Sequence, residues 1–527
     1  MPKNSTVGRY SVYPAVGGLE TVSIPGAQTQ GRLTSGSNFI IDLSGAKRKH
    51  PGIARRQDNG STVITTGNTR GLFDLWRTSG SVKVQSTLVV TGGKVYADSG
   101  DGIYADKTGA FVIASTDNVY MDAFSGLLII GFDVNPGTGP LKYNGTTLAA
   151  LGGTPPNFKY PRVWQGRLWG AGRSTNPDVL YASVIDNPED WTLASGAQSI
   201  NIDIGDQDPI GITALFPGLF GRMVVAKRRS LYEITPVSST FAVNQLVAGI
   251  GCVSHNAVAA ADNDIYFVSE RGVHSLLMTD KFGQLETAFL SYPIQNFFQD
   301  YIDFRRAGNM RAIYVPEINC YLLAATLKGS YRNDIVLGYN FVHKEWFRFD
   351  ENVSAMSKYV DPQDGYKTKV LVANDAGQIG ILDTQGIDRT VTWFDERRTT
   401  QFTTGLIFPI NVATEVNLSK LTCFYRPQVA GSEFTVSYYA DGKFIEDLTF
   451  PMDPASGSII GQAIIGAGAL IGGRGVIKQA TRQMRGVCHS TELVFTHIPQ
   501  SDEDDFELYG YTVEFEYAGE SEKTKTQ

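Results

Sequence analysis

Carboxylates are the side chains in this sequence that could most readily carry out a reaction. Two of them held a fixed distance apart can hydrolyse a glycosidic bond, one as the acid and the other as the nucleophile or base. The acids that could in principle converge in this way are Asp264, Glu270, Asp383 and Asp395. The repeated Ser-x-Asp-x-Gly-x-x-Trp turns that accompany such chemistry in some glycosidases are absent from the sequence. We therefore interpret these acids as residues of turns and solvated faces.

The motifs of other enzymes and of cofactor binding are also missing. Neither Gly93-Lys94 nor Gly442-Lys443 has the upstream glycine of a phosphate-binding P-loop, and "WGAGRST" lacks the third glycine of a dinucleotide-binding loop. The sequence has no HExxH pair and no GxSxG elbow, and its four cysteines form no CxxC pair, which favours buried free thiols. We predict that the chain is not an enzyme, has no catalytic residues, and binds no cofactor and no metal.

The overall charge argues against a surface built to hold nucleic acid. The chain of 527 residues has 53 acidic and 46 basic side chains, which gives a formal net charge of -7. A protein that grips phosphates clusters lysine and arginine, so a weakly acidic chain is expected to repel DNA. The first residues show no apolar segment after a basic start, and we expect no signal peptide and folding in a cytoplasm.

From about residue 69 the sequence is a succession of short apolar runs separated by Gly, Asn, Asp or Ser. Runs such as "STLVVTGGKVYAD" and "NDIYFVSERGVHSLL" are typical of β-hairpins. Their first strands recur at intervals in the forties, with 41 residues from Val224 to Ile265 and 48 from Ile265 to Ile313. A period of this length made of strands is typical of β-propeller blades, and about six blades fit the available length, with five or seven also compatible. The stretch "ETAFLSYPIQNFFQDYIDF" (residues 286–304) predicts a short helix between blades.

One hairpin, "VWQGRLWGAGRSTNPDVLYAS" (residues 163–183), could be a ligand-binding loop or one of the repeated hairpins that form the blades. Its glycines allow tight turns and close packing of strands, and Trp164, Trp169 and Tyr181 supply large apolar faces. We favour packing between blades, with a partner-facing aromatic patch as the alternative.

Beyond about residue 390 the strands become longer and alternate apolar with polar side chains, which is typical of a sandwich or barrel. We therefore predict an all-β fold, a β-propeller of about six blades with an N-terminal arm and a C-terminal β-sandwich-like domain. The predicted divisions are an extended N-terminal arm (1–58), the β-propeller (59–389), the β-sandwich-like domain (390–519) with a Gly-rich insertion (455–483), and a polar tail (520–527).

Several stretches between about residues 38 and 350 occur in an order and spacing known from one family. They are, in chain order, "NFIIDLSGAKRKHPGI", "VWQGRLWGAG" with "VLYASVIDNPEDW", "ITALFPGLFGRMVVAKRRSLYEI", "GCVSHNAVAAADNDIYFVSERGVHSL" and "VHKEWFRF". Together they make the chain resemble the tail hub or nozzle proteins of short-tailed bacteriophages, also called packaged-DNA stabilisation proteins. The sandwich region is less similar.

The resemblance implies a structural virion protein. It implies a homo-oligomeric ring of six copies, a hexamer, that docks on the portal and adaptor rings, carries tail fibres or spikes, retains the packaged double-stranded DNA and later forms its ejection channel. The DNA would pass without sequence-specific binding. The protein would be made in the host bacterial cytoplasm and located in the virion tail. A virion propeller that binds or cleaves host-surface carbohydrate is the alternative.

Three surface segments are candidate contact sites. The residues of the candidate docking arm, which could contact an acidic neighbouring ring or be ordinary surface charge, are Lys47, Arg48 and Lys49. The residues of an acidic run, which could be a solvated loop, a metal site or a DNA-repelling channel loop, are Asp502, Glu503, Asp504 and Asp505. The apolar residues of the Gly-rich insertion are Ile464, Ile465, Leu470 and Ile471. This insertion could pack against neighbouring subunits, gate the distal end of the channel or touch a membrane.

Overall fold

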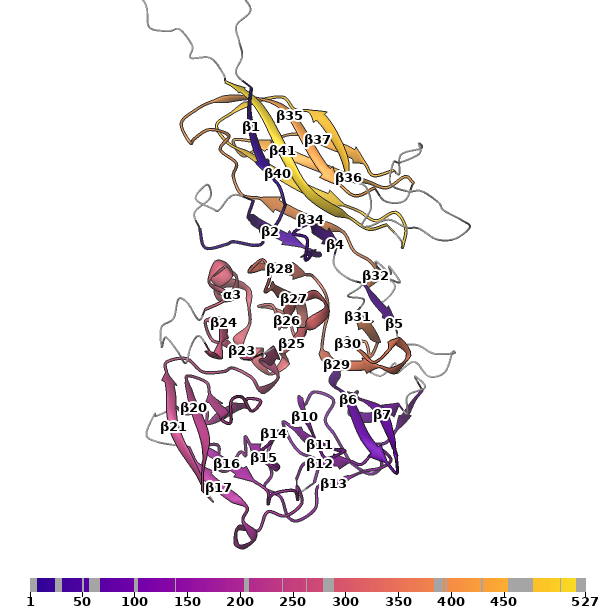
Figure 1. Ribbon diagram of the computed structural model, residues 1–527, viewed down its shortest axis with the longest axis vertical. Coiled ribbons are helices and arrows are strands. Elements are labelled where there is room, and N and C mark those ends of the chain that lie inside the picture. Colours follow the sequence, from indigo (N-terminus) through magenta and orange to yellow (C-terminus); the bar gives the residue numbers. More distant parts are fainter. Residues whose placement is uncertain are drawn as a thin grey trace, which may run out of the picture. The chain divides into compact units, whose positions relative to one another are not determined.

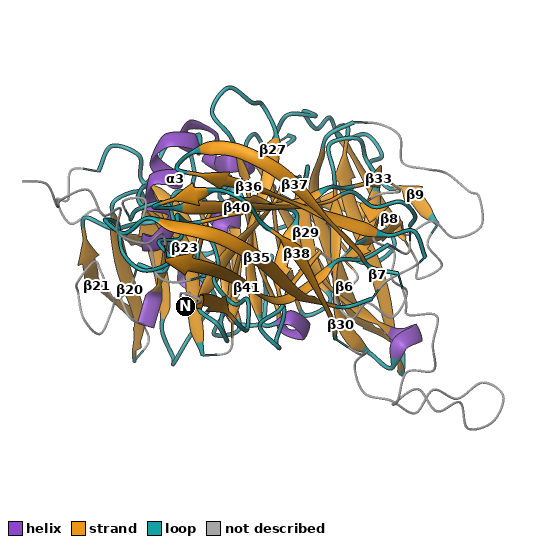
Figure 2. Cartoon of the chain, turned by 90° about the horizontal axis from the view of Figure 1, so that it is seen from above, coloured by secondary structure: helices purple, strands orange, loops and turns teal. Residues whose placement is uncertain are grey.

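The computed structural model describes residues 7–23, 31–49, 52–55, 67–98, 103–137, 139–202, 208–238, 240–261, 263–277, 289–382, 392–393, 396–427, 430–453, 477–502 and 504–517. The chain divides into two compact units. The multi-sheet unit spans residues 53–337 and 350–384, and the sandwich unit spans residues 1–52, 338–349 and 385–527. Strands dominate both units (Figure 2).

Seven small antiparallel sheets follow one another in the described part of the multi-sheet unit (Figure 1). The first two consist of β6 (Thr69–Ser79), β7 (Val82–Thr91), β8 (Lys94–Asp98) and β9 (Tyr104–Asp106), and of β10 (Val119–Phe124), β11 (Leu127–Phe132), β12 (Leu141–Tyr143) and β13 (Leu148–Ala150). The next two consist of β14 (Tyr160–Trp164), β15 (Arg167–Ala171), β16 (Val179–Ala182) and β17 (Gln198–Asn201), and of β18 (Ile212–Leu215), β19 (Met223–Lys227), β20 (Ser230–Val237) and β21 (Thr240–Ala248).

The other three sheets of this unit are less uniform. The fifth contains β22 (Val258–Ala261), β23 (Asp264–Ser269) and β24 (Gly272–Ser275). The sixth has the order β25 (Arg311–Val315), β26 (Cys320–Thr326), β27 (Asn333–Asn340) and β28 (Glu345–Phe349), of which residues 338–349 are counted with the sandwich unit. The seventh contains β29 (Ala355–Asp361), β30 (Lys367–Ala373), β31 (Ile379–Leu382) and β5 (Ile53–Arg55), so a strand from early in the chain belongs to it.

Helical segments of the multi-sheet unit are short. They are α3 (Gln295–Tyr301) and the 3₁₀ segments η1 (Leu193–Ser195), η2 (His255–Ala257), η3 (Tyr292–Ile294), η4 (Phe304–Asn309), η5 (Pro316–Ile318) and η6 (Pro362–Asp364). The short helix that the sequence predicts within residues 286–304 is confirmed as α3. Of the helices in the described ranges, none has the length and apolar content that crossing a membrane requires.

Neighbouring sheets bury their apolar faces against one another. The β14–β15 hairpin turns through Gln165 and Gly166, both with positive φ, which is the geometry of a tight two-residue hairpin. This turn places Trp164 and Trp169 in a core cluster with Met223 of the next sheet. The interpretation of this hairpin as packing between sheets is therefore confirmed. A further cluster joins β29, β30 and β31 to β6, β7 and β9.

Two antiparallel sheets make up most of the described sandwich unit. The first has the order β3 (Phe39–Ile41), β4 (Lys47–Lys49), β41 (Glu507–Tyr517), β35 (Val416–Tyr425) and β38 (Lys478–Gln483), with β1 (Val7–Val12) on β41 and β39 (Val487–Cys488) on β35. The second has the order β2 (Leu33–Ser37), β34 (Thr400–Thr404), β40 (Thr491–His497), β36 (Glu433–Ala440) and β37 (Lys443–Pro451). Other strands of this unit are β28 (Glu345–Phe349) and the short hairpin of β32 (Thr392–Trp393) and β33 (Glu396–Arg397).

Aromatic side chains hold the two sheets of the sandwich unit face to face. The ring centroids of Phe495 on β40 and Tyr511 on β41 lie 5.4 Å apart, and those of Tyr425 on β35 and Phe434 on β36 lie 5.0 Å apart. Buried and less buried residues alternate along β36 and β40, as expected for strands with one face in a core.

The two units differ from the division that the sequence predicts. The described residues of the predicted arm form strands: β1 and β4 pair with β41, β2 pairs with β34, and β5 belongs to the multi-sheet unit. Seven small sheets are described, one more than the six blades that the sequence favours and within the five to seven that its uneven spacing allows. The predicted tail, 520–527, lies outside the described residues, as does most of the insertion, of which only 477–483 is described.

Candidate functional site

Polar side chains on the first strands of the sheets join each sheet to its neighbours. The Asp122 carboxylate on β10 accepts a hydrogen bond of 2.7 Å from the Val163 amide on β14. The Arg162 guanidinium on β14 donates to the Leu215 carbonyl on β18 at 3.1 Å. His255 in η2 accepts from the Leu215 amide through Nδ1 at 3.1 Å. These bonds connect four successive segments through side chains.

Arg311 on β25 makes similar connections between segments that are distant in the sequence. It is 5% exposed and donates to the carbonyls of Gly308 at 2.7 Å, Met310 at 2.9 Å and Arg70, on β6, at 3.1 Å. Burial lowers the pKa of Arg311 to about 10, with Tyr120 opposing that shift, so the guanidinium stays charged at neutral pH.

A third connection links the seventh sheet to the first. The Asp74 carboxylate on β6 accepts from the Val360 amide on β29 at 3.1 Å, and the Gln85 amide group donates to the Val360 carbonyl at 2.7 Å. Gln85 also donates to Asp74 at 2.8 Å. Both oxygens of the Asp74 carboxylate therefore accept hydrogen bonds from other groups of the protein.

Aromatic and imidazole groups on these strands are held in their neutral forms. Tyr120 donates to Asp133 at 3.1 Å and packs edge-on against Tyr160, whose ring stacks on His255 at 5.2 Å. Burial raises the pKa of Tyr120 well above its usual value and lowers the pKa of His255 well below its usual value. Both groups therefore keep one protonation state through the neutral range, and the arrangement provides rigidity rather than proton transfer.

The acids that could converge for glycoside hydrolysis are not brought together where the structure describes them. Asp264 and Glu270 lie at opposite ends of the β23 hairpin. Asp264 accepts from the amides of Ile265 at 2.7 Å and Leu277 at 3.0 Å, and Glu270 pairs with Arg228 at 2.6 Å. Their roles are local turns and ion pairs. The remaining two candidates, Asp383 and Asp395, lie outside the described residues.

Metal-ligating residue types are dispersed in the described part of the chain, where no three His, Cys, Asp or Glu side chains gather closely enough to hold a metal ion. The prediction of buried free thiols is confirmed for all four cysteines. Burial raises the pKa of the Cys252 thiol to about 12, which leaves it protonated and unreactive at neutral pH.

The candidate docking triplet forms strand β4, and its two lysines face inward. Because side chains alternate along a strand, Lys47 and Lys49 share one face, and they are 2% and 1% exposed. The Lys47 ammonium donates to the Ala15 carbonyl at 2.5 Å, and Arg48 pairs with Asp505 at 3.2 Å. The structure therefore does not support docking of these lysines on an acidic ring, because burial removes them from the surface.

Two residues of the acidic run are buried as well. Asp504 and Asp505 are 0% and 2% exposed. The Asp504 carboxylate accepts from the Gln500 amide at 2.8 Å and from the Ser432 hydroxyl, and it lies 3.4 Å from His497 Nε2. Burial raises the pKa of Asp504, but these three interactions outweigh it and leave the pKa below its usual value. Neither carboxylate is in a position to line a channel or face solvent.

The other residues of these segments are exposed or outside the described residues. Asp502 is the surface residue of the run, with a side chain 64% exposed and an ion pair of 2.7 Å to Arg397. Glu503 lies outside the described residues. The candidate gate or subunit-contact residues, which also lie outside them, are Ile464, Ile465, Leu470 and Ile471.

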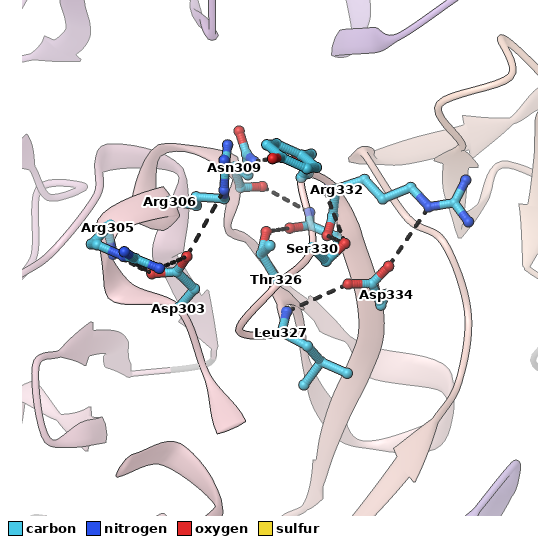
Figure 3. Close-up of polar contacts among 11 residues, drawn as sticks. Asp303, Arg305, Arg306, Asn309, Thr326, Leu327, Ser330, Arg332 and Asp334 are labelled. Atoms are coloured by element: carbon cyan, nitrogen blue, oxygen red, sulfur yellow. Dashed lines mark hydrogen bonds and ion pairs between the residues drawn. The ribbon is translucent and has the colours of Figure 1, made fainter. Parts of the chain in front are cut away.

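A group of exposed arginines was not singled out in the sequence. It consists of Arg305 and Arg306 in η4, and Tyr331 and Arg332 in the turn between β26 and β27, and we call it the arginine–tyrosine surface. Figure 3 shows Arg305 and Arg306 beside Asp303, and Arg332 extending away on the other side toward Asp334. The available signal was a doubled arginine followed by a polar turn with an adjacent Tyr-Arg pair, a pattern that ordinary surface charge also produces.

Comparisons with known proteins do not identify a family. No family model and no curated protein matches the chain. Among solved structures, the extracellular domain of a putative one-component system from B. thetaiotaomicron has a TM-score of 0.39 and 11% identity, over 80% of this chain. This chain spans half the length of that protein. An exo-β-1,3-galactanase from Phanerochaete chrysosporium with galactose has a TM-score of 0.26 and 9% identity, over 88% of this chain and 100% of that one. Likeness at these levels carries no argument about function.

Proposed function

We propose that the chain is a structural subunit of the tail nozzle of a short-tailed bacteriophage. In this role it docks on the portal and adaptor rings, helps to retain packaged DNA and forms part of the ejection channel. The order and spacing of the sequence stretches between about residues 38 and 350 support this proposal. We propose further that the sheets of the multi-sheet unit are the blades of a β-propeller. Shared core clusters join the first five sheets in succession, and another joins the seventh sheet to the first, which supports that arrangement.

The observation that carries the structural role is the use of polar groups on the first strands. In a propeller that acts on carbohydrate, carboxylates near the middle of the ring must remain available to the substrate. Here Asp74 and Asp122 accept hydrogen bonds from backbone amides of neighbouring sheets. These hydrogen bonds join neighbouring sheets, as is expected of a structural subunit that must withstand mechanical load.

The same observation bears on the route of the DNA. Asn256 in η2, just before the first strand of the fifth sheet, donates to the Val119 carbonyl on the first strand of the second sheet at 3.0 Å, so side chains bridge segments of sheets that are not successive. A duplex therefore passes between copies of the chain rather than through one multi-sheet unit. A ring of six copies, with fibres or spikes attached outside it, provides such a channel.

The proposal is tested by electron microscopy of the purified chain mixed with portal–adaptor complex, with the complex alone as control. The expected result is an added closed ring, six-fold in views down the axis, with an opening wide enough for duplex DNA. Chains that stay monomeric and leave the complex unchanged would overturn the nozzle role. Turnover or binding of a bacterial surface polysaccharide by such monomers would then establish the carbohydrate alternative.

A further inference from the structure

We propose that the arginine–tyrosine surface contacts the phosphates of duplex DNA. This inference rests on the proposed function, and it names the part of the chain that meets the packaged genome. It concerns a local surface, whereas the net charge of -7 is an average over the whole chain.

Arg306 lies between the other two arginines and is half-buried, with a side chain 36% exposed. Its guanidinium lies 4.4 Å from the centre of the Tyr331 ring, and its ion pair with Asp303 is long, at 3.9 Å. The Tyr331 ring does not accept the in-plane N–H groups of the guanidinium, so these groups can donate to an external acceptor. The fork of an arginine matches two oxygens of a phosphate.

The neighbouring charges are arranged with the carboxylates inside and the cations outside. Arg305 is bound to Asp303 by two hydrogen bonds of 2.9 and 3.0 Å, yet its side chain is 84% exposed while that of Asp303 is 5% exposed. Arg332, 3.6 Å from Asp334, is 63% exposed against 25% for the acid. An approaching polyanion therefore meets guanidinium groups first, and the carboxylates behind them hold the cations in place.

Hydrogen bonds beneath the surface fix the two turns relative to each other. Asn309 donates to the Tyr331 carbonyl at 3.4 Å, and Asn333 donates to the Asn309 carbonyl at 2.8 Å. Thr326 in turn donates to Asn333 at 2.9 Å (Figure 3). Because the frame is already bonded, little conformational entropy is lost when a ligand binds.

The spread of the three arginines favours a row of phosphates over a single acidic group. Arg305 and Arg332 extend to opposite sides of Arg306 in Figure 3, so they cannot close on one carboxylate. The exposed Tyr331, 77% exposed, adds a hydroxyl that can donate to a phosphate oxygen. Contacts of this kind read no base sequence and weaken with salt, which suits DNA that must later slide.

Fluorescence anisotropy of a labelled duplex of about 20 base pairs with the full chain, over a series of salt concentrations, tests the inference. Three phosphate contacts predict a slope of log K against log salt of about -2.7. The double variant Arg306→Ala with Arg332→Ala is expected to reduce the slope to about -0.9. Arg9→Ala is the matched control, since Arg9 is 69% exposed and also paired with an acid, and it is expected to leave the slope unchanged.

Three results would overturn the inference. The first is a wild-type slope that the double variant does not change. The second is no binding at about 20 mM salt, where phosphate contacts are strongest. The third is equal binding of polyglutamate at the same charge concentration, which would assign the surface to an acidic protein. Ring formation on the portal–adaptor complex is measured for the same variants. A double variant that forms rings but has lost DNA binding supports the inference, whereas wild-type chains that bind DNA but form no ring count against the nozzle role alone.

Discussion

The multi-sheet unit and the sandwich unit both bury cations, but they surround them with different partners. The multi-sheet unit buries Arg311, which donates to backbone carbonyls of its own turn and of β6, and Lys227, which pairs with Asp178 at 2.8 Å. The sandwich unit buries Lys47 and Lys49 on the inner face of β4. Burial lowers the pKa of Lys47 to about 7 and that of Lys49 to about 8, with nearby carboxylates opposing the shift, whereas Arg311 keeps a pKa of about 10.

This difference matters because only one kind of buried cation changes its charge near neutral pH. A guanidinium holds its proton through that range and is a permanent fastener. A buried lysine with a pKa near neutrality can release its proton, and the stability of the structure around it then depends on pH. We expect Arg311 to keep its charge in mild alkali and the sandwich unit to respond to it through Lys47 and Lys49.

Replacing Arg311 is expected to have the largest effect on the free energy of unfolding. Arg311→Leu leaves three buried carbonyls without their donor, and we expect the free energy of unfolding to fall by about 4 kcal/mol. Urea denaturation followed by tryptophan fluorescence measures this loss. Arg229→Leu is the control, because Arg229 is 72% exposed and its replacement is expected to cost less than about 0.5 kcal/mol. Equal losses in the two variants would contradict the role of Arg311 as a fastener.

Lys47→Met tests the lysine side of the comparison. The folded pKa of Lys47, about 7, lies below the usual lysine value of 10.5, so between these values the unfolded chain binds more protons and stability rises with pH. From neutral pH to about pH 9.5, wild type is expected to gain about 3 kcal/mol relative to the variant.

Thermal melting of both proteins over this range measures the gain at Lys47. The lost hydrogen bond to the Ala15 carbonyl shifts the difference by a constant amount and not its slope, and Glu345 is the acid that opposes the shift. A difference that stays flat with pH would show that Lys47 keeps its proton in the fold.

His274 gives the smallest predicted effect, in the multi-sheet unit and on the acid side. It is fully buried and stacks on Phe289 at 4.9 Å, and burial, with a contribution from Arg271, lowers its pKa to about 4. Since the usual pKa of histidine is 6.5, the unfolded chain binds more protons between these pH values, and stability falls as pH decreases through that window.

His274→Phe keeps the ring stack and removes the titration. Relative to this variant, wild type is expected to lose about 2 kcal/mol between neutral pH and about pH 4.5. Urea denaturation at several pH values measures the difference, and Ser269→Ala controls for the lost hydrogen bond to His274. A wild-type curve parallel to that of the variant would contradict the lowered pKa.

The sequence predicted the hairpins well because each pairs residues that are close in the chain. The turn at Gly166 and the two tryptophans beside it are readable within about twenty residues. The strands of the predicted arm were not readable, since β1 pairs with a strand some 500 residues later and a local pattern contains no information about such a partner. The position of β5 in the seventh sheet escaped prediction for the same reason.

The candidate site residues were harder to predict than the fold. Lys47, Arg48 and Lys49 read as surface charge, because lysine and arginine are rarely buried, and the alternation of a three-residue strand is too short to reveal an inward face. The arginine–tyrosine surface was missed for the opposite reason, since its residues are exposed and exposed charge is ordinary. What distinguishes it is the cation over the Tyr331 ring, a contact between two separate turns.

The pairing of β1 with β41 also sets the order in which the chain can fold during synthesis. Arg9 and Glu514, which meet across these strands, are 505 residues apart in the sequence. At about 5 to 20 residues per second, a ribosome needs on the order of half a minute to two minutes between them. The hairpins of the multi-sheet unit can form as they emerge, while β1 waits with an open edge. The strand "VGRYSV", which contains a charged residue, is suited to this delay, because it has little tendency to aggregate with other nascent chains on the same messenger RNA.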